Sequence, residues 1–399
     1  MYKKILYKYA IIILLIGLFS SCKTNPTAQD EYGLAAPLDS LLAPVFPSDA
    51  PGVVVIVAKG DTILYDKSFG LARLDSVMPM SDDILLNVSS STKTFTAAAI
   101  LKLAEEGKLS LDDKLVKYFP NFPENVLGSI TLRQVLGHTS GIPDERPRTH
   151  AQWEKYLKDN TSIFGYGPDY CIYGREAELT RYLEKLDTLS FEPGTRFERQ
   201  DPPYMLLSTV IEQASGIPFE KWMQQYIFDP AGVKSATFIR PDMPMGRTAH
   251  GYAQAEGCQK PKIFRSANGR WDEYDYGEAF FFLTKADRGL YITPLDFVKL
   301  QNALFSGKLI SEESLALFRT PIISSDKLGE GCSLGINVSE DCNGRIKLFH
   351  RSMRGGFFAL EAYYPDNGVM YLLFSNRNDW NPESMQTAFE KVLCDKNII

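Results

Sequence analysis

Runs of apolar residues with two different periods alternate along the chain and predict a mixed α/β protein. The continuous β-branched run VVVIVAK at 53–59 is typical of a buried strand, and a turn at Lys59-Gly60-Asp61 separates it from a second strand, TILYDKSFG, at 62–70. Over 92–107 the apolar positions recur with helical spacing and end at a glycine, which predicts a capped helix. The segment NVSSSTK at 87–93 is therefore predicted to be a strand-to-helix junction.

The other apolar segments predict strands towards both ends of the chain and helices between them. The region at about 109–287 combines tyrosine, proline and scattered helical patterns, and we expect a mostly helical insertion with long loops. A helix from Thr293 leads into two strand candidates at 357–364 and 369–376, and an amphipathic helix follows at about 382–393. This order predicts one sheet built from both ends of the chain.

The first 21 residues have the pattern of an export signal. The cationic start MYKKILYKYA precedes an apolar run, IIILLIGLF, that is short for a bilayer span. The run ends in Phe19-Ser20-Ser21-Cys22, which resembles the lipobox of bacterial lipoproteins, although an ordinary signal peptide near a chance cysteine is the alternative. We expect Cys22 to be lipidated, 22–37 to form a tether, and a lipid anchor to hold the protein in the membrane of the bacterial cell envelope, facing the periplasm or in the outer membrane.

Composition and charge narrow the expected partners. The chain has 399 residues, 44% hydrophobic content and a formal net charge of −6 without a basic block, so neither nucleic acid nor an anionic membrane surface is implied as a partner. The six cysteines include no CxxC spacing and the four histidines are scattered, so we expect no metal site and no other cofactor. A disulfide between Cys332 and Cys342 is conceivable in an oxidising envelope, but the spacing alone does not determine which cysteines pair. A small-molecule or peptide substrate remains.

Ser90 and Lys93 are three residues apart at the first turn of the predicted helix, so their side chains can meet on one face. A desolvated lysine can take the proton of a serine hydroxyl and make it nucleophilic, and the free N–H groups of a helix start can hold an oxyanion. The same spacing recurs at Ser20 to Lys23 and at Ser324 to Lys327. These residues alone therefore allow the alternative of a helix N-cap and a solvated lysine.

Longer segments resemble, in order, the serine β-lactamase, penicillin-binding protein and carboxylesterase family, particularly its class C-like branch. They are PGVVVIVAKGDTILYDKSFG, SSTKTFTAAAILKLAEEGKLSLDDKLVKYFP, ITLRQVLGHTSGI, FEPGTRF, LLSTVIEQASGIPFEKW, PAGVKSATF and GLYITPLDFVKLQNALFSGKL. The resemblance implies an α/β (α+β) fold in which an antiparallel sheet is flanked by helices, with one domain at 38–395. Its sheet region is expected at about 38–108 and 288–395. Ser90 would be the acylated nucleophile and Lys93 its partner.

The second motif of this family, Tyr-x-Asn, aligns with Arg199-Gln200-Asp201. An arginine cannot replace the tyrosine as a general base, because it stays protonated. If Arg199 lies near Lys93, its charge lowers the pKa of the lysine. Asp201 would instead attract the lysine proton, unless it pairs with Arg199 and leaves Lys93 free.

The third motif of the family aligns with His350-Arg351-Ser352, where His350 fits and Ser352 replaces an expected glycine. The resemblance places this motif on a strand at one wall of the cleft. The backbone N–H of Met353, with that of Ser90, is the implied oxyanion hole. An ordinary strand-end histidine is the alternative for His350.

Two functions fit these observations. The first is an envelope-anchored serine hydrolase that acts through an acyl-enzyme at Ser90 on an ester, an amide or a D-amino-acid peptide. The second is a catalytically impaired family member that uses the cleft to bind peptidoglycan fragments, peptides or an envelope protein. The intact Ser90-x-x-Lys93 favours the first, whereas Arg199 and Ser352 favour the second.

Overall fold

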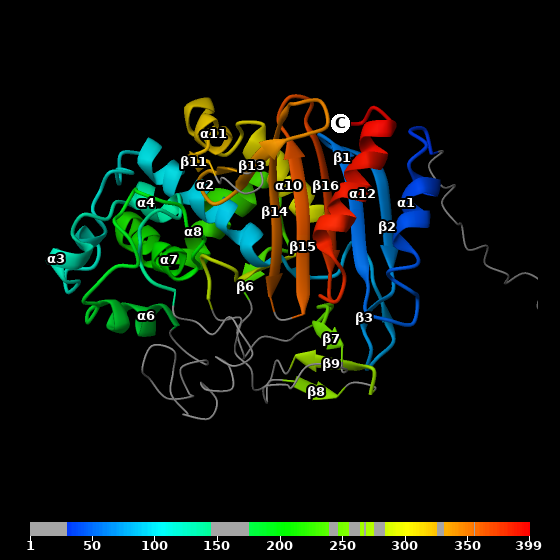
Figure 1. Cartoon of the computed structure of the whole chain (residues 1–399), viewed down its shortest axis with the longest axis horizontal. Helices are drawn as coiled ribbons and strands as arrows, with labels where there is room; N and C mark the ends of the chain where they lie inside the picture. Colours follow the sequence, from blue (N-terminus) through cyan, green and yellow to red (C-terminus); the bar gives the residue numbers. More distant parts are fainter. Residues whose placement is uncertain are drawn as a thin grey trace, which may run out of the picture.

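The computed structural model describes residues 30–144, 175–238, 246–254, 264–266, 269–274, 284–324, 331–354 and 356–399. Its centre is an eight-stranded sheet in the order β11-β12-β13-β14-β15-β16-β1-β2, in which neighbouring strands are antiparallel (Figure 1). The strands are β1 (Val53–Lys59), β2 (Thr62–Phe69), β11 (Ile323–Ser324), β12 (Gly331–Cys332), β13 (Asn337–Glu340), β14 (Ile346–Arg354), β15 (Phe357–Tyr364) and β16 (Val369–Ser375). The sheet therefore joins residues from both ends of the chain.

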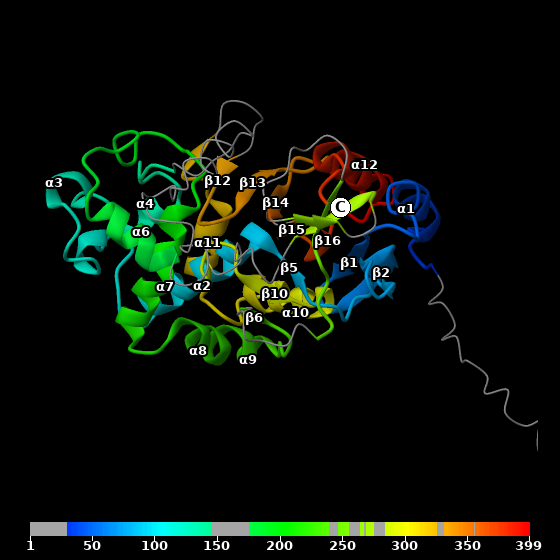
Figure 2. The same cartoon turned by 90° about the horizontal axis from the view of Figure 1, so that it is seen from below.

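Helices cover both faces of the sheet. In Figures 1 and 2, α1 (Ala35–Leu42) and α12 (Pro382–Asp395) lie on one face, and α2 (Thr92–Glu105) and α10 (Pro294–Phe305) lie on the other. Val54 and Ile56 of β1 belong to the same apolar cluster as Phe95 of α2, whereas Val53 and Val55 belong to the cluster beneath α1 and α12. Because β1 is buried on both faces, its sequence is continuously apolar rather than alternating.

The region predicted to be a helical insertion contains helices and a small sheet. Its helices are α3 (Glu124–Leu127), α4 (Leu132–Leu136), α6 (Arg175–Leu183), α7 (Pro202–Ser215), α8 (Phe219–Met223) and α9 (Asp229–Ala231). A three-stranded sheet in the order β7-β9-β8 joins β7 (Tyr252–Gln254), β8 (Phe264–Ser266) and β9 (Trp271–Tyr274). α7 packs against α2 and so closes the region onto the helix that carries Lys93.

Several predicted elements are confirmed at their expected places. β15 occupies 357–364 as predicted, and the predicted strand at 369–376 is β16. The last residues assigned to the tether 22–37 belong instead to the folded domain, because Leu34 is buried and α1 begins at Ala35. The export signal at 1–21 and Cys22 lie outside the described residues.

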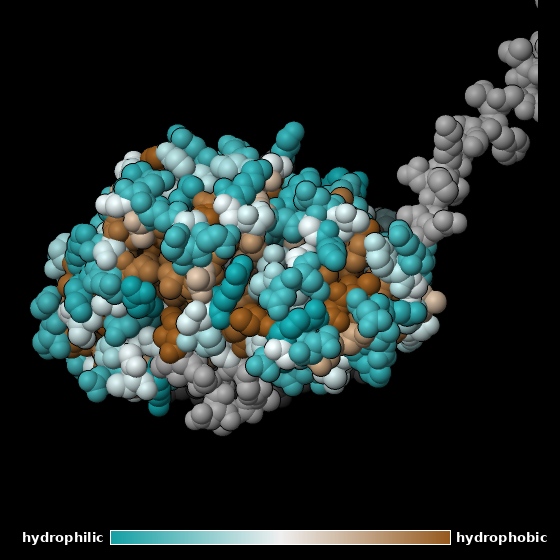
Figure 3. Space-filling view, turned by 90° about the horizontal axis from the view of Figure 1, so that it is seen from above, coloured by the Kyte–Doolittle hydropathy of each residue, from teal (hydrophilic) through white to brown (hydrophobic). Residues whose placement is uncertain are grey.

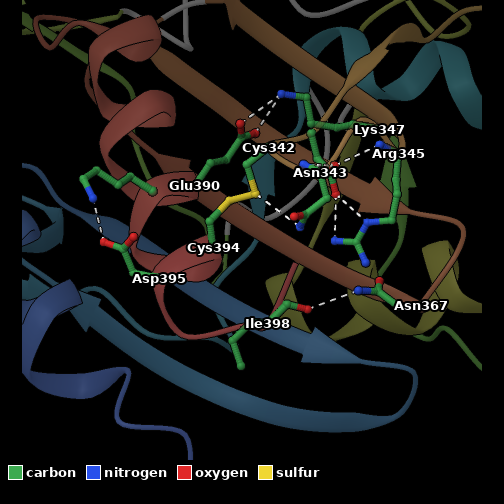
Figure 4. Close-up of a disulfide and its surroundings, with 11 residues drawn as sticks. Cys342, Asn343, Arg345, Lys347, Asn367, Glu390, Cys394, Asp395 and Ile398 are labelled. Carbon is green, nitrogen blue, oxygen red and sulfur yellow. Dashed lines mark hydrogen bonds and ion pairs between the residues drawn. A yellow bond between two sulfur atoms is a disulfide. The ribbon is translucent and has the colours of Figure 1, made fainter.

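Cys332 and Cys342, the pair that the sequence left conceivable, do not form a disulfide with each other. Cys342, in the turn after β13, is bonded to Cys394 in α12 (Figure 4). Cys332 is a buried free thiol. The physical reason is placement: Cys332 lies within the sheet, whereas the turn that carries Cys342 faces the end of α12. The pair of Lys347 with Glu390, 3.0 Å apart, adds a second link between the β13–β14 hairpin and α12.

The face of the molecule seen from above in Figure 3 is largely polar. Figure 3 shows hydrophilic residues over most of one face, with apolar residues between them in separate patches. Within the described ranges, no helix has both the length and the apolar character that a membrane span requires.

Candidate active site

A tight turn presents Ser90 at the start of α2. The chain leaves the short strand β5 (Leu86–Asn87) and forms the 3-10 turn η1 (Ser89–Ser91) directly before α2. Ser89 has a φ of +49°, a left-handed conformation that L-residues rarely adopt, and its N–H donates to Asn87 Oδ1 at 2.9 Å. The residue preceding α2 is Ser91, and its side chain makes no capping hydrogen bond. The N-cap alternative for Ser90 is therefore wrong.

Lys93 is completely buried and lies against Ser90, so the solvated-lysine alternative is also wrong. Its Nζ contacts three groups: Ser90 Oγ at 3.1 Å, Asp201 Oδ1 at 2.7 Å and the backbone oxygen of Asp287 at 3.1 Å. A neutral amine has two N–H groups and one lone pair. Two of its partners only accept hydrogen bonds, and the third, Ser90, carries an O–H that can donate. The three contacts match the three N–H donors of an ammonium group, and after loss of one proton the lone pair can face Ser90 Oγ while the two remaining N–H groups keep Asp201 and Asp287 as acceptors.

Asp201 joins Lys93 to a second cation. One carboxylate oxygen contacts Lys93, and the other forms an ion pair with Arg288, while the Asp201 side chain is only 4% exposed. The hypothesis that Asp201 pairs with Arg199 is wrong, because Arg199 has other partners. One carboxylate shared between two cations attracts the lysine proton less than a carboxylate devoted to Lys93 would.

The pKa of Lys93 is lowered to about 8. Burial is the largest cause, because an ammonium group loses its hydration inside the protein. The negative charge of Asp201 opposes this change and the positive charge of Arg288 supports it. Arg288 is thus the cation with the largest effect in lowering the lysine pKa.

Hydrogen bonds hold the segment of Asp287 and Arg288 against α2 and its preceding strand. Asn87 Nδ2 donates to the backbone oxygen of Arg288 at 3.0 Å, and Thr96 Oγ1 donates to that of Ala286 at 2.7 Å. The sequence reasoning missed Asp287 and Arg288. The sequence feature that could have indicated them is that two charged residues directly precede GLYITP, a segment without charged residues.

Arg199 and His350 form a separate pair beside the lysine cluster. The Arg199 guanidinium contacts Asn337 Oδ1 at 3.3 Å and His350 Nδ1 at 3.1 Å, and His350 Nε2 lies 3.0 Å from Thr94 Oγ1. Because a guanidinium only donates, Nδ1 must accept, and Nε2 carries the proton and donates to Thr94. Burial holds the pKa of His350 well below its usual range, so the ring is neutral.

The strand that carries Met353 runs beside the turn that carries Ser90, because β14 packs against η1. Within the described chain, β14 pairs with β13 only as far as Phe349, so 350–354 lies beyond that pairing. Ser352 is buried, whereas Met353 is 51% exposed. The oxyanion role of the Met353 N–H stays a prediction.

Within the described residues, no group of three or more His, Cys, Asp or Glu side chains could hold a metal ion. The described site thus contains a candidate nucleophile, Ser90, a candidate base, Lys93, and two arginines, Arg199 and Arg288.

Comparisons with known proteins agree with this geometry. The family model described as Beta-lactamase matches residues 43–393. Penicillin-binding protein 4* of Bacillus subtilis (strain 168) is 32% identical over 196 residues, which are 49% of this chain and 40% of that protein. A putative D-alanyl-D-alanine carboxypeptidase of Escherichia coli (strain K12) is 24% identical over 317 residues, 72% of this chain and 69% of that protein.

A solved structure extends the comparison to the whole fold. The D-amino acid amidase from Ochrobactrum anthropi SV3, in its complex with D-phenylalanine, matches with a TM-score of 0.72 and 21% sequence identity, over 92% of this chain and 100% of that chain. At this identity the likeness shows a shared fold.

Proposed function

Because the chain belongs to the Beta-lactamase family, we propose that it is a serine hydrolase that forms an acyl-enzyme at Ser90. The observation that carries the proposal is the position of Lys93 Nζ, 3.1 Å from Ser90 Oγ, with Asp201 and the Asp287 carbonyl as acceptors for the two N–H groups that remain when the amine is deprotonated.

The reaction would proceed in two steps. Ser90 Oγ attacks the substrate carbonyl carbon while its proton passes to Lys93 Nζ, and the lysine then gives that proton to the leaving alcohol or amine. Water next attacks the acyl carbon while one of its protons passes to Lys93 Nζ, and the lysine gives that proton to Ser90 Oγ as the acid product leaves. The backbone N–H groups of Ser90 and Met353 would stabilise the oxyanion in both steps.

The substrates we propose are esters, amides or D-amino-acid peptides. Two of the matched proteins are named for related chemistry, a putative D-alanyl-D-alanine carboxypeptidase and a D-amino acid amidase. The match to penicillin-binding protein 4* covers only 40% of that relative. The activity of this protein is therefore itself part of the proposal.

The test is intact-mass analysis after incubation with a fluorophosphonate probe and, separately, with a penicillin. We expect a single adduct with the fluorophosphonate, mapped by peptide sequencing to Ser90 rather than to Ser89 or Ser91. If neither reagent labels the protein under conditions that label an active relative, the second function gains support. Arg199 at the motif position of the general-base tyrosine already favours that function, in which the cleft binds peptidoglycan fragments, peptides or an envelope protein.

The rate of labelling should depend on pH through Lys93. A base must be unprotonated, and the lysine pKa is about 8. We therefore expect the labelling rate to fall by about ten-fold per pH unit below that value and to level off above it. Fluorophosphonate is the suitable reagent, because fluoride leaves without needing a proton. A rate that is constant between pH 6 and pH 9 would contradict the assignment of Lys93 as the base.

Arg288 should control the midpoint of that pH profile. In Arg288→Met, Asp201 loses its second cation and acts on Lys93 alone, so the pKa of the lysine should rise and the midpoint should move to higher pH. Asp201→Asn removes the negative charge and should move the midpoint to lower pH. Arg133→Met, at an exposed pair with Asp112, is the control and should leave the midpoint unchanged.

We also propose that Cys22 carries a lipid that anchors the protein in the bacterial cell envelope. The support is the small-residue segment before Cys22 and a disulfide between Cys342 and Cys394, which suits an oxidising compartment. In a bacterial host, we expect the full chain to incorporate labelled palmitate and to partition into detergent. Cys22→Ser should abolish both, and incorporation by that variant would contradict the proposal.

A further inference from the structure

His138 lies in the turn after α4 and has an unusual backbone conformation. Its φ is +55°, in the left-handed region, and the residue is buried. Histidine adopts this region more often than most residues do, but the conformation persists only where the surrounding contacts hold it. Two rings supply such contacts: Tyr204 of α7 stacks on His138 with 4.9 Å between the ring centroids, and Phe197 lies edge-on at 6.0 Å. The packing therefore fixes the direction of the imidazole.

Two atoms of His138 bind the loop that carries the second motif. The backbone oxygen accepts a hydrogen bond from the Glu198 N–H at 3.0 Å, and Nδ1 accepts one from the Gln200 N–H at 3.2 Å. Among the described residues, neither polar atom of the Gln200 side-chain amide has a hydrogen-bond partner. The backbone N–H, and not the side chain, therefore anchors Gln200 to the rest of the protein.

The imidazole of His138 must be neutral to accept this hydrogen bond. Burial holds the pKa of His138 well below its usual range, and the positive charges of Arg199 and Lys93 lower this pKa further. Because Nδ1 accepts, it carries no proton, and the proton of the neutral ring lies on Nε2. The acceptor is therefore present throughout the pH range in which Lys93 changes its charge.

The anchored N–H lies between the two charged side chains of the loop. Arg199 precedes Gln200 and contacts His350, whereas Asp201 follows Gln200 and contacts Lys93 Nζ at 2.7 Å. Consecutive Cα atoms are only about 3.8 Å apart, so a shift of the peptide at Gln200 moves its neighbours as well. The contact between Asp201 and Lys93 therefore depends on where the Gln200 N–H is held.

We propose that His138 is a positioning residue for Lys93: by accepting the Gln200 N–H, it keeps the Asp201 carboxylate against the lysine and so sets the strength of that lysine as the base for Ser90. The inference rests on the proposed hydrolase function for the reaction, but the placement of Asp201 does not require that reaction. Without Nδ1, the buried Gln200 N–H would lose its acceptor, which is unfavourable. The loop should then move until this N–H finds another acceptor, and Asp201 should withdraw from Lys93.

The first arm of the test compares substitutions of His138 by the pH profile of fluorophosphonate labelling. His138→Phe keeps an aromatic ring but has no acceptor, whereas His138→Asn loses the ring, places Oδ1 where Nδ1 was and tolerates a positive φ. As Asp201 withdraws in His138→Phe, the midpoint should fall by about one pH unit, the low end of what a nearby opposite charge contributes. His138→Asn should keep the midpoint of the wild type. If His138→Phe does not fold, His138→Gly removes the acceptor without backbone strain.

A double variant and a matched control separate this role from a general effect on folding. In Asp201→Asn the charge that His138 positions is already absent, so His138→Phe should cause no further shift of the midpoint in that background. Thr139→Val removes a buried hydroxyl from the next residue of the same turn, where it donates to the backbone oxygen of Gln134. We expect this control to keep the midpoint of the wild type. Circular dichroism checks that each variant is folded.

The second arm titrates Lys93 directly and needs no catalysis. The full chain is produced with lysine carrying carbon-13 at Cε, and the NMR signal of Lys93 is the one absent from Lys93→Met. Its midpoint should fall in His138→Phe and stay in His138→Asn. This result in a chain that is never labelled would support the positioning role and overturn the hydrolase. A labelled chain in which the acceptor-free variants leave the Lys93 midpoint unchanged would overturn the positioning role and keep the hydrolase.

Discussion

Replacing Ser90 by alanine is expected to abolish both the fluorophosphonate adduct and the hydrolysis of any substrate found for the wild type. The Ser90 hydroxyl lies 3.1 Å from Lys93 Nζ, and no other hydroxyl contacts that amine among the described residues. Without Oγ there is no atom to carry the acyl group. Loss of the nucleophile in serine hydrolases lowers turnover on the order of 10⁶-fold. The measurements are the intact mass of the variant and its hydrolysis rate against the uncatalysed rate.

The neighbouring serines provide matched controls. Ser89→Ala and Ser91→Ala each remove one buried hydroxyl from the same 3-10 turn without touching Ser90. We expect both variants to be labelled. An adduct that persists in Ser90→Ala and disappears in one of these two would move the nucleophile to that serine and contradict the proposed site.

The fold and the family could be predicted because their signals are local or recur along the chain. Apolar residues follow one uninterrupted pattern in the strand at 357–364 and another in the helix that begins at Thr92, and the structure confirms both elements at these places. The resemblance to the β-lactamase family is confirmed by the match over residues 43–393. The spacing of Ser90 and Lys93 was likewise local, because one helical turn determines whether the two side chains meet.

The partners of the lysine could not be predicted in the same way. Asp201 lies 108 residues from Lys93 and the Asp287 carbonyl lies 194 residues away, so their contacts depend on how α7 and the segment before β10 (Leu290–Ile292) pack against α2. The motif alignment placed Arg199 and Asp201 in the right loop but could not say which of them faces Lys93. Arg288 belongs to no motif that the sequence reasoning considered.

Replacing Lys93 by methionine is expected to lower the fluorophosphonate labelling rate by about 10²- to 10⁴-fold, the usual cost of losing a general base. Methionine has a similar length and fills the same buried space, but it cannot accept the Ser90 proton. Lys102→Met is the matched control: it removes a lysine from the same helix, whose ammonium donates to the backbone oxygen of Leu309 and has no other hydrogen-bond partner among the described residues. A Lys93→Met rate within ten-fold of the wild type would show that another group acts as the base.

The effect of this substitution on stability should itself depend on pH. The pKa of Lys93 is lowered on folding, from an ordinary value of 10.5 to about 8, so the unfolded chain binds this proton more tightly than the folded protein does. That difference destabilises the wild type fully below pH 8 and disappears as the pH rises from 8 towards 10.5. Methionine has no such penalty. The melting temperature of Lys93→Met relative to wild type should therefore be higher at pH 6 than at pH 9.5, with Asp201 still paired to Arg288 in the variant. The opposite order would mean that the Lys93 ammonium stabilises the fold, and a lysine held in that state would be a poor base for Ser90.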